Sequence, residues 1–212
     1  MLTLPENQEI STSLISIAKF CAEKNLVPAT SGNFSARINS GKILITQSGK
    51  DKAKLLDSDL MEIDYSGRAL NPSEKPSAET LLHTQIYSIF PKVNFIAHFH
   101  SSSSAVLSKV LLKKGITEVK LNDFELLKAL SGVTTHEHTE IIPIFANDQD
   151  ISRLASKTLN VLTEATSSKQ THGYILAGHG LYTWGVTEAE TIRHVDAINT
   201  LLESYILELQ LS

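Results

Sequence analysis

The stretch Val93-Asn94-Phe95-Ile96-Ala97-His98-Phe99-His100 is a mostly apolar run that ends on two histidines. The length and apolar character of residues 93–97 predict a buried strand. Side chains at positions i and i+2 of a strand share a face, so His98 and His100 present two imidazoles together while Phe99 points into the opposite layer. Two imidazoles fixed on one rigid strand suit a divalent metal ion, because neutral imidazole is a common ligand of zinc.

The segments before this strand predict a helix followed by antiparallel strands. Apolar residues recur at helical spacing over residues 8–24 and predict an opening amphipathic helix. Short β-prone segments then follow one another through glycine-containing turns, which favours antiparallel pairing. These strands are predicted at residues 34–38, 42–46 and 60–65.

Helices and strands alternate after this point. Ser77 opens a predicted helix that runs to about Phe90, and the serines at 101–104 cap the helix that follows the two histidines. Further elements are predicted as a short helix at 124–130, a strand at 140–145, a helix at 148–166, a strand or hairpin at 173–184 and a final helix at 187–209. This order predicts an α/β fold in which a mainly antiparallel central β-sheet is flanked by helices on both faces.

The composition predicts one compact, soluble domain over residues 1–212. The chain has 212 residues, 42% of them hydrophobic, so it can bury one substantial core. The formal net charge of -4 gives no basic surface, which argues against nucleic acid or an anionic membrane as a partner. The single cysteine, Cys21, excludes an intrachain disulfide, and there is no signal-peptide pattern and no apolar run of the roughly 20 residues that span a bilayer. We therefore expect a cytoplasmic protein.

His179 is the best candidate for a third metal ligand. A catalytic zinc site typically has three protein ligands and one open position. His179 directly follows the apolar strand predicted at 174–176, and Gly178 and Gly180 on either side allow close backbone approach. The alternative is a turn histidine with a hydrogen-bonding role.

The other histidines fit a metal site less well. His136 and His138 have the same spacing as the first pair, but they lie in a polar stretch that indicates a solvated loop. His83 and His194 fall within predicted helices and are interpreted as surface or packing residues, and His172 as a residue that caps a loop.

Three turns of small residues could bind an anionic substrate through backbone N–H groups and hydroxyls. They contain Ser31-Gly32-Asn33, Ser48-Gly49-Lys50 and Ser77. Lys50 would add positive charge, although each turn alone is ordinary turn chemistry and a lone lysine in a turn is more often solvated than functional. No glycine-rich phosphate loop or dinucleotide fingerprint is present.

Taken together, five segments resemble the class II aldolase/adducin-like family of zinc-dependent sugar-phosphate enzymes, and the likeness covers nearly the whole chain. These segments are Ala29-Thr30-Ser31-Gly32-Asn33-Phe34-Ser35, Ser48-Gly49-Lys50-Asp51, Lys75-Pro76-Ser77-Ala78-Glu79-Thr80, Ala97-His98-Phe99-His100-Ser101 and Ala177-Gly178-His179-Gly180-Leu181-Tyr182-Thr183-Trp184-Gly185. Two more stretches, at 124–130 and 142–150, resemble the dehydratase branch of the family in particular.

The resemblance implies a class II aldolase-like fold, a small phosphorylated sugar as substrate and one zinc ion (Zn2+) per subunit held by His98, His100 and His179. It also implies a homotetramer with active sites near subunit interfaces. The implied reaction is the dehydration of a phosphorylated methylthio pentulose in methionine salvage, with Glu125 as the catalytic acid and base. The alternative for Glu125 is an exposed carboxylate in the first turn of a short helix.

The sequence leaves open the role of Glu79 and the reaction that the metal site serves. In aldolases of the family, the glutamate that matches Glu79 touches the metal and moves protons, whereas some dehydratases carry a non-acidic residue there. A zinc-dependent aldolase or epimerase acting on a sugar phosphate would use the same metal site. A non-catalytic scaffold of the adducin type is a further alternative, but it is expected to lack the metal ligands.

Overall fold

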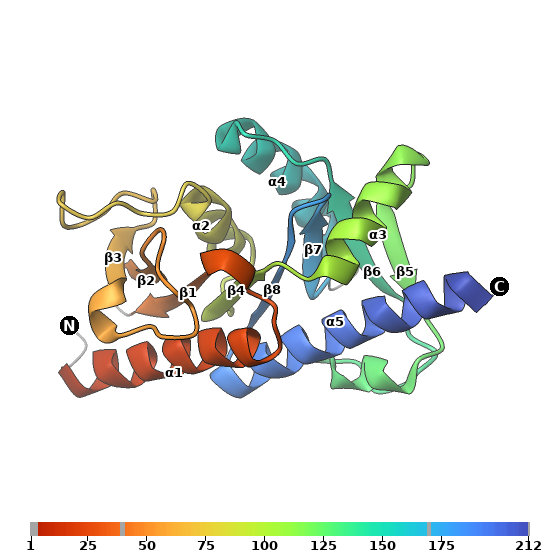
Figure 1. The fold of residues 1–212 in the computed structure, drawn as a ribbon, viewed down its shortest axis with the longest axis horizontal. Coiled ribbons are helices and arrows are strands. Elements are labelled where there is room, and N and C mark those ends of the chain that lie inside the picture. The colour runs from red at the N-terminus through yellow and green to blue at the C-terminus, as the bar shows by residue number, and fades with distance from the viewer. Residues whose placement is uncertain (1–3, 39–40, 169–170, 212) are drawn as a thin grey trace.

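The computed structural model describes residues 4–38, 41–168 and 171–211, which form a central sheet covered by helices (Figure 1). The strands are β1 (Asn33–Ile38), β2 (Lys42–Thr46), β3 (Leu60–Asp64), β4 (Phe95–Phe99), β5 (Glu118–Leu121), β6 (Glu140–Phe145), β7 (Gly173–Leu176) and β8 (Gly180–Gly185). The helices are α1 (Leu4–Glu23), α2 (Thr80–Ile89), α3 (Ser102–Lys113), α4 (Ile151–Ser168) and α5 (Glu188–Leu211), with 3-10 turns η1 (Pro28–Thr30), η2 (Asp57–Asp59) and η3 (Glu125–Ala129).

The eight strands lie in the order β3-β2-β1-β4-β8-β7-β6-β5. Neighbouring strands are antiparallel except β6 and β7, which are parallel. The predicted α/β fold, with a mainly antiparallel sheet, is therefore confirmed. Among the described helices, none combines the length and apolarity that a bilayer crossing requires.

Two apolar cores lie on opposite faces of the sheet, and alternate side chains of β4 pack into one core or the other. Phe95, Ala97 and Phe99 pack into the core beneath α1, α3 and α5. Ile96 lies in the other core, under α2 and α4. In Figure 1, α1 and α5 run together along one side of the sheet. Because alternate residues of β4 face opposite cores, His98 lies on the α2 face, as the spacing predicted.

Caps set the starts of the helices that border the site. Ser101 is the N-cap of α3, as predicted, and its hydroxyl accepts a hydrogen bond from the backbone N–H of Ser104. α2 begins at Thr80, which leaves Glu79 at its N-cap position. α4 begins later than predicted because the Asp150 carboxylate accepts the N–H of Arg153 and so caps the helix.

One strand was not predicted. β5 lies at the edge of the sheet and, among the described strands, pairs with β6 alone. It has four residues, and two of them, Glu118 and Lys120, are charged and partly or fully exposed. Such a short, polar edge strand gives no apolar run for a sequence pattern to detect. The segment predicted as a strand or hairpin at 173–184 is a hairpin, formed by β7 and β8.

Candidate metal centre

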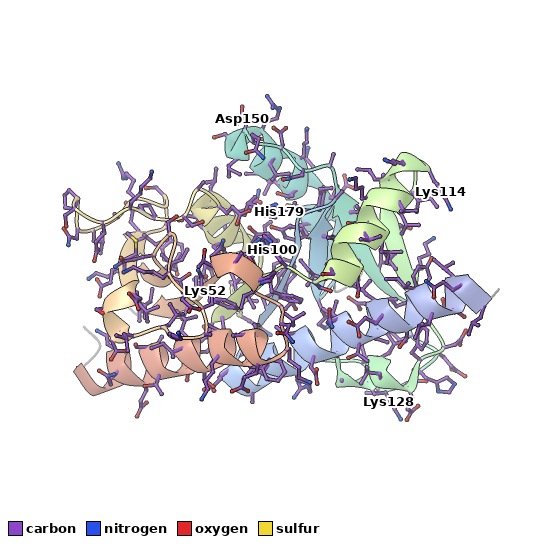
Figure 2. All side chains as sticks on the ribbon, in the orientation of Figure 1. Lys52, His100, Lys114, Lys128, Asp150 and His179 are labelled. Atoms are coloured by element: carbon purple, nitrogen blue, oxygen red, sulfur yellow. The ribbon has the colours of Figure 1, made fainter. Side chains whose placement is uncertain are left out.

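Three histidines converge where β4 meets the β7–β8 turn. His98 lies on β4, His100 follows that strand directly, and His179 lies in the turn between β7 and β8. One ring nitrogen from each lies within 4.8 Å of those of the other two, and the Nε2 atoms of His98 and His100 are 3.0 Å apart. Figure 2 shows His100 and His179 close together near the centre of the molecule. The structure thus brings together the three residues that the sequence singled out.

Hydrogen bonds and burial leave these rings ready to bind a metal. The Nδ1 atom of His98 donates to the backbone oxygen of Leu181 at 3.2 Å, and Nδ1 of His179 donates to Oδ1 of Asn147 at 3.3 Å. Each of these bonds fixes the tautomer that leaves Nε2 free. Burial, followed by the neighbouring histidines, holds the pKa of His98 well below its usual value. Burial and then His179 lower the pKa of His100 to about 4, so both rings are neutral at pH 7.

Gly180 makes room for the two rings on β4. A Cβ atom at this position would lie 2.7 Å from Cε1 of His98, 2.9 Å from Cδ2 of His100 and 2.6 Å from the backbone oxygen of Phe99. These separations are far shorter than a normal contact between carbon atoms. The flanking glycine is therefore required by the position of the histidines, as the sequence suggested.

Glu79 also belongs to this centre. Its two carboxylate oxygens lie 3.3 Å from Nε2 of His98 and 3.2 Å from Nε2 of His179. The Asn33 side-chain amide donates to the same carboxylate at 2.7 Å. Three imidazoles beside one carboxylate form a donor set that fits a divalent ion such as zinc.

A cavity of about 350 Å³ opens beside the histidines. Most of the residues predicted to bind an anion line it, namely Ser31, Gly32, Asn33, Ser48, Gly49 and Ser77, together with Glu79, His100 and His179. The Ser31 hydroxyl is buried and has no hydrogen-bond partner in the described structure. Because buried polar atoms are nearly always paired, this hydroxyl is suited to bind a polar ligand in the cavity.

The positive charge at the cavity comes from Lys52, which the sequence interpretation missed. The structure does not place Lys50 in the cavity wall, because its Nζ atom pairs with Asp59 at 2.8 Å. Lys52 lines the cavity, and its Nζ donates to the backbone oxygens of Thr30 at 3.1 Å and Lys50 at 2.7 Å. Burial lowers the pKa of Lys52, although Asp51 and Asp59 oppose this effect. No pattern in the sequence distinguishes these two lysines.

The structure does not bring Glu125 to the metal centre of its own chain. Glu125 begins η3, its side chain is 73% exposed, and it forms an ion pair with Lys128. Figure 2 shows Lys128 at the edge of the molecule beyond α5, away from His100 and His179. The hydrogen bond from Lys128 lowers the pKa of Glu125, so the carboxylate is ionised at pH 7.

The remaining histidines form no other group of three possible ligands within the described residues. His136 is exposed near Glu125, and His138 pairs with the buried Glu140 at 3.1 Å. His83 and His194 are buried and hydrogen-bonded, so they pack in the interior and do not lie on the surface. His172 is buried, and its ring is hydrogen-bonded to Glu140 at 3.1 Å and to the backbone oxygen of Ser131, in the loop after η3, at 2.9 Å.

Comparison with known proteins agrees with this geometry. Residues 12–206 match the family model of the class II aldolase and adducin N-terminal domain. The chain is 44% identical over 200 residues to a methylthioribulose-1-phosphate dehydratase of Sorangium cellulosum, covering 94% of this chain and 92% of that one. It is 46% identical over 193 residues to a protein of the same name from Methylococcus capsulatus, covering 91% of each.

A solved structure shows the same fold. The crystal structure of L-fuculose-1-phosphate aldolase from Thermus thermophilus matches with a TM-score of 0.70 at 25% identity, covering 95% of this chain and 94% of that one. The family model and the two relatives each span nearly the whole chain. The protein therefore belongs to the class II aldolase and adducin family.

Proposed function

We propose that this chain is a metal-dependent hydro-lyase that acts in methionine salvage in the cytoplasm. It removes water from 5-methylthioribulose 1-phosphate and gives 2,3-diketo-5-methylthiopentyl 1-phosphate. The observation that carries the proposal is the convergence of one ring nitrogen from each of three histidines beside a cavity lined by serines and glycines. The substrate is taken from the relatives that are 44% and 46% identical to this chain.

His98, His100 and His179 would hold one zinc ion per subunit. Three neutral imidazoles with an open fourth position are the usual ligand set of catalytic zinc. A bound zinc ion would act as a Lewis acid that polarises the C2 carbonyl of the substrate and so acidifies the proton on C3. The hydrogen bonds from His98 to Leu181 and from His179 to Asn147 hold the two rings in the orientation that binding the metal ion requires.

The substrate phosphate would bind at the serine- and glycine-lined end of the cavity. The hydroxyls of Ser31, Ser48 and Ser77 and the backbone N–H groups of the adjoining turns supply hydrogen-bond donors. Lys52 in the cavity wall supplies the positive charge for the phosphate, which was predicted for Lys50. A charge-assisted hydrogen bond of this kind is roughly twice as strong as a neutral one.

Glu125 would act in the site of a neighbouring subunit within a homotetramer. It is exposed on its own chain and lies outside the cavity, so it can reach a metal centre only across an interface. As a base it takes the proton from C3, and as an acid it returns that proton to the C4 hydroxyl, which leaves as water. The resulting enol takes up a proton at C4 and becomes the diketone.

Mixed tetramers test this assignment. Glu125→Gln removes the acid–base group and keeps the histidines, whereas His98→Ala removes a ligand and keeps Glu125. Each variant alone should be inactive. If Glu125 acts across an interface, co-refolding the two variants in equal amounts restores roughly a quarter of the sites, because one subunit supplies each part. Mixtures that stay as inactive as the separate variants would show that Glu125 does not act in this way.

An aldolase is the second candidate, and the position of Glu79 favours it. Glu79 contacts both His98 and His179, as a proton-moving carboxylate of an aldolase would. Mass spectrometry after incubation with 5-methylthioribulose 1-phosphate separates the two functions. The dehydratase proposal predicts a single product that has lost water, whereas an aldolase gives two fragments from cleavage between C3 and C4. A non-catalytic scaffold is disfavoured because all three histidines are in place.

A further inference from the structure

A chain of buried hydrogen bonds runs from the Asn33 amide, which contacts Glu79, to side chains that do not line the cavity. Asn33 and Ser35 lie two residues apart on β1 and therefore point to the same face, toward α2. His83, on α2, contacts both of them. Its Nδ1 atom lies 2.7 Å from the Ser35 hydroxyl, and its Nε2 atom is hydrogen-bonded to Oδ1 of Asn33. One imidazole thus joins two polar residues of the strand.

Only one arrangement of hydrogens satisfies this line of contacts. The Glu79 carboxylate accepts a hydrogen bond from Nδ2 of Asn33 at 2.7 Å, so Oδ1 of that amide faces His83 and needs a donor. Burial lowers the pKa of His83 to about 3, so the ring is neutral and carries a single N–H group. That group must be on Nε2, and Nδ1 then accepts from the Ser35 hydroxyl, which lies 2.9 Å from the Tyr87 hydroxyl.

These polar groups lie beside the apolar core under α2 and α4. His83 and Ser35 are fully buried, and their surroundings include Leu82 and Ile86 of the same core. Burying polar side chains is costly unless they are hydrogen-bonded, and each bond returns only about 1 kcal/mol net. Apolar side chains at these positions would serve packing equally well. The line of bonds therefore does little for stability, but it fixes the orientation of one amide, that of Asn33.

Asn33 is well placed to pass this orientation to the metal centre. In the pairing of β1 with β4 it lies directly opposite His98. Its amide contacts Glu79, and Glu79 contacts Nε2 of both His98 and His179. If the amide were flipped, its oxygen would face the carboxylate with no hydrogen between them, and Glu79 would be pushed away.

We propose that His83 is a positioning residue: its Nε2–H group fixes the Asn33 amide, which in turn holds Glu79 against the histidine triad. This deepens the proposed function and rests on it for the effect on turnover. His83 itself touches neither the metal ligands' nitrogen atoms nor the cavity.

Two substitutions at one position separate this role from simple packing. In His83→Gln the side-chain amide reaches the place of Nε2 and can still donate to Asn33. In His83→Asn the shorter side chain reaches only the place of Nδ1, so the donor to Asn33 is lost. We expect His83→Gln to keep kcat within about threefold and His83→Asn to lose roughly 10- to 100-fold, with a smaller change in KM.

Thr84→Val is the matched control. Thr84 is the next residue on α2, is also buried, and its hydroxyl bonds only to the backbone oxygen of Leu81 within the described structure. The substitution should lower the melting temperature and leave kcat unchanged. If His83→Gln and His83→Asn instead lose kcat equally, in proportion to their loss of melting temperature, His83 is a packing residue and the proposal is wrong.

Crystal structures of the metal-free variants give a readout that does not depend on activity. The contact between Nδ2 of Asn33 and Glu79 should persist in His83→Gln and be lost in His83→Asn. An unchanged contact in His83→Asn would overturn the proposal. A wild-type protein that fails to dehydrate the substrate would contradict the proposed function, but the structural comparison would still test the positioning role.

Discussion

Replacing Gly180 by alanine should weaken metal binding, because the new Cβ atom would occupy space that the histidine rings fill. It would lie 2.7 Å from Cε1 of His98 and 2.9 Å from Cδ2 of His100. Carbon atoms pack no closer than about 3.5 Å, so the two rings must move by about 0.8 Å and 0.6 Å respectively. The Cβ atom would also lie 2.6 Å from the backbone oxygen of Phe99, which cannot move aside as a side chain can.

These displacements exceed the tolerance of a zinc site, in which ligand distances vary by only about 0.2 Å. Mutations that disturb the groups which position metal ligands typically lower metal affinity roughly 10- to 100-fold, or about 1.4 to 2.8 kcal/mol. We expect Gly180→Ala to show this loss when zinc is titrated in competition with a chromophoric chelator.

Gly185→Ala is the control for this experiment, since Gly185 also lies on β8. Its Cβ would meet Oγ1 of Thr191 at 2.6 Å, a clash of the same severity that lies away from the histidines. This variant should lose thermal stability but bind zinc normally. Gly180→Ala protein that is folded and binds zinc as tightly as the wild type would refute the placement of the metal between these rings.

Three further predictions concern residues outside the triad. Glu125→Gln should abolish turnover but keep one zinc per subunit by elemental analysis, and near-normal turnover would exclude Glu125 as the acid–base group. Lys52→Met should raise KM for the phosphorylated substrate roughly 10- to 100-fold, because it removes a charged donor from the cavity wall, whereas Lys50→Met should change it little. For His172, burial opposes protonation, but the hydrogen bond and charge of Glu140 outweigh it and raise the pKa. A raised folded-state pKa means that the stabilisation is complete below the unfolded pKa of about 6.5 and is lost as pH rises through the folded value. In urea unfolding, His172→Gln should therefore lower the free energy of unfolding more at pH 6 than at pH 9. An equal loss at the two pH values would contradict a charged pair between His172 and Glu140.

The histidine triad could be predicted from the sequence because local patterns determine most of it. The period of two along a strand places His98 and His100 on one face and Phe99 on the other, and the structure has Phe99 in the opposite core. His179 follows an apolar strand and is flanked by glycines, which marks a turn at the same edge of the sheet. Apolar strands and glycine-rich turns are the features that sequence patterns show most clearly.

Other parts of the site could not be predicted because they depend on contacts between distant residues. Lys50 and Lys52 look alike in sequence. In the folded chain, Lys50 pairs with Asp59 and lies outside the cavity wall, whereas Lys52 lines the cavity. His83 could not be distinguished from an ordinary core histidine, because its partner Asn33 lies fifty positions away. Glu125 raises a different difficulty, since the proposed site for it belongs to a second subunit.

The central claim is that the histidine triad holds the metal on which dehydration depends, and zinc reconstitution tests it most directly. The enzyme is freed of metal with a chelator, zinc is added back in steps, and formation of the diketone from 5-methylthioribulose 1-phosphate is measured at each step. We predict no activity without zinc and a linear rise that ends at one equivalent per subunit, with no such rise for His98→Ala. Full activity in the metal-free protein, or recovery in His98→Ala equal to that of the wild type, would contradict this claim.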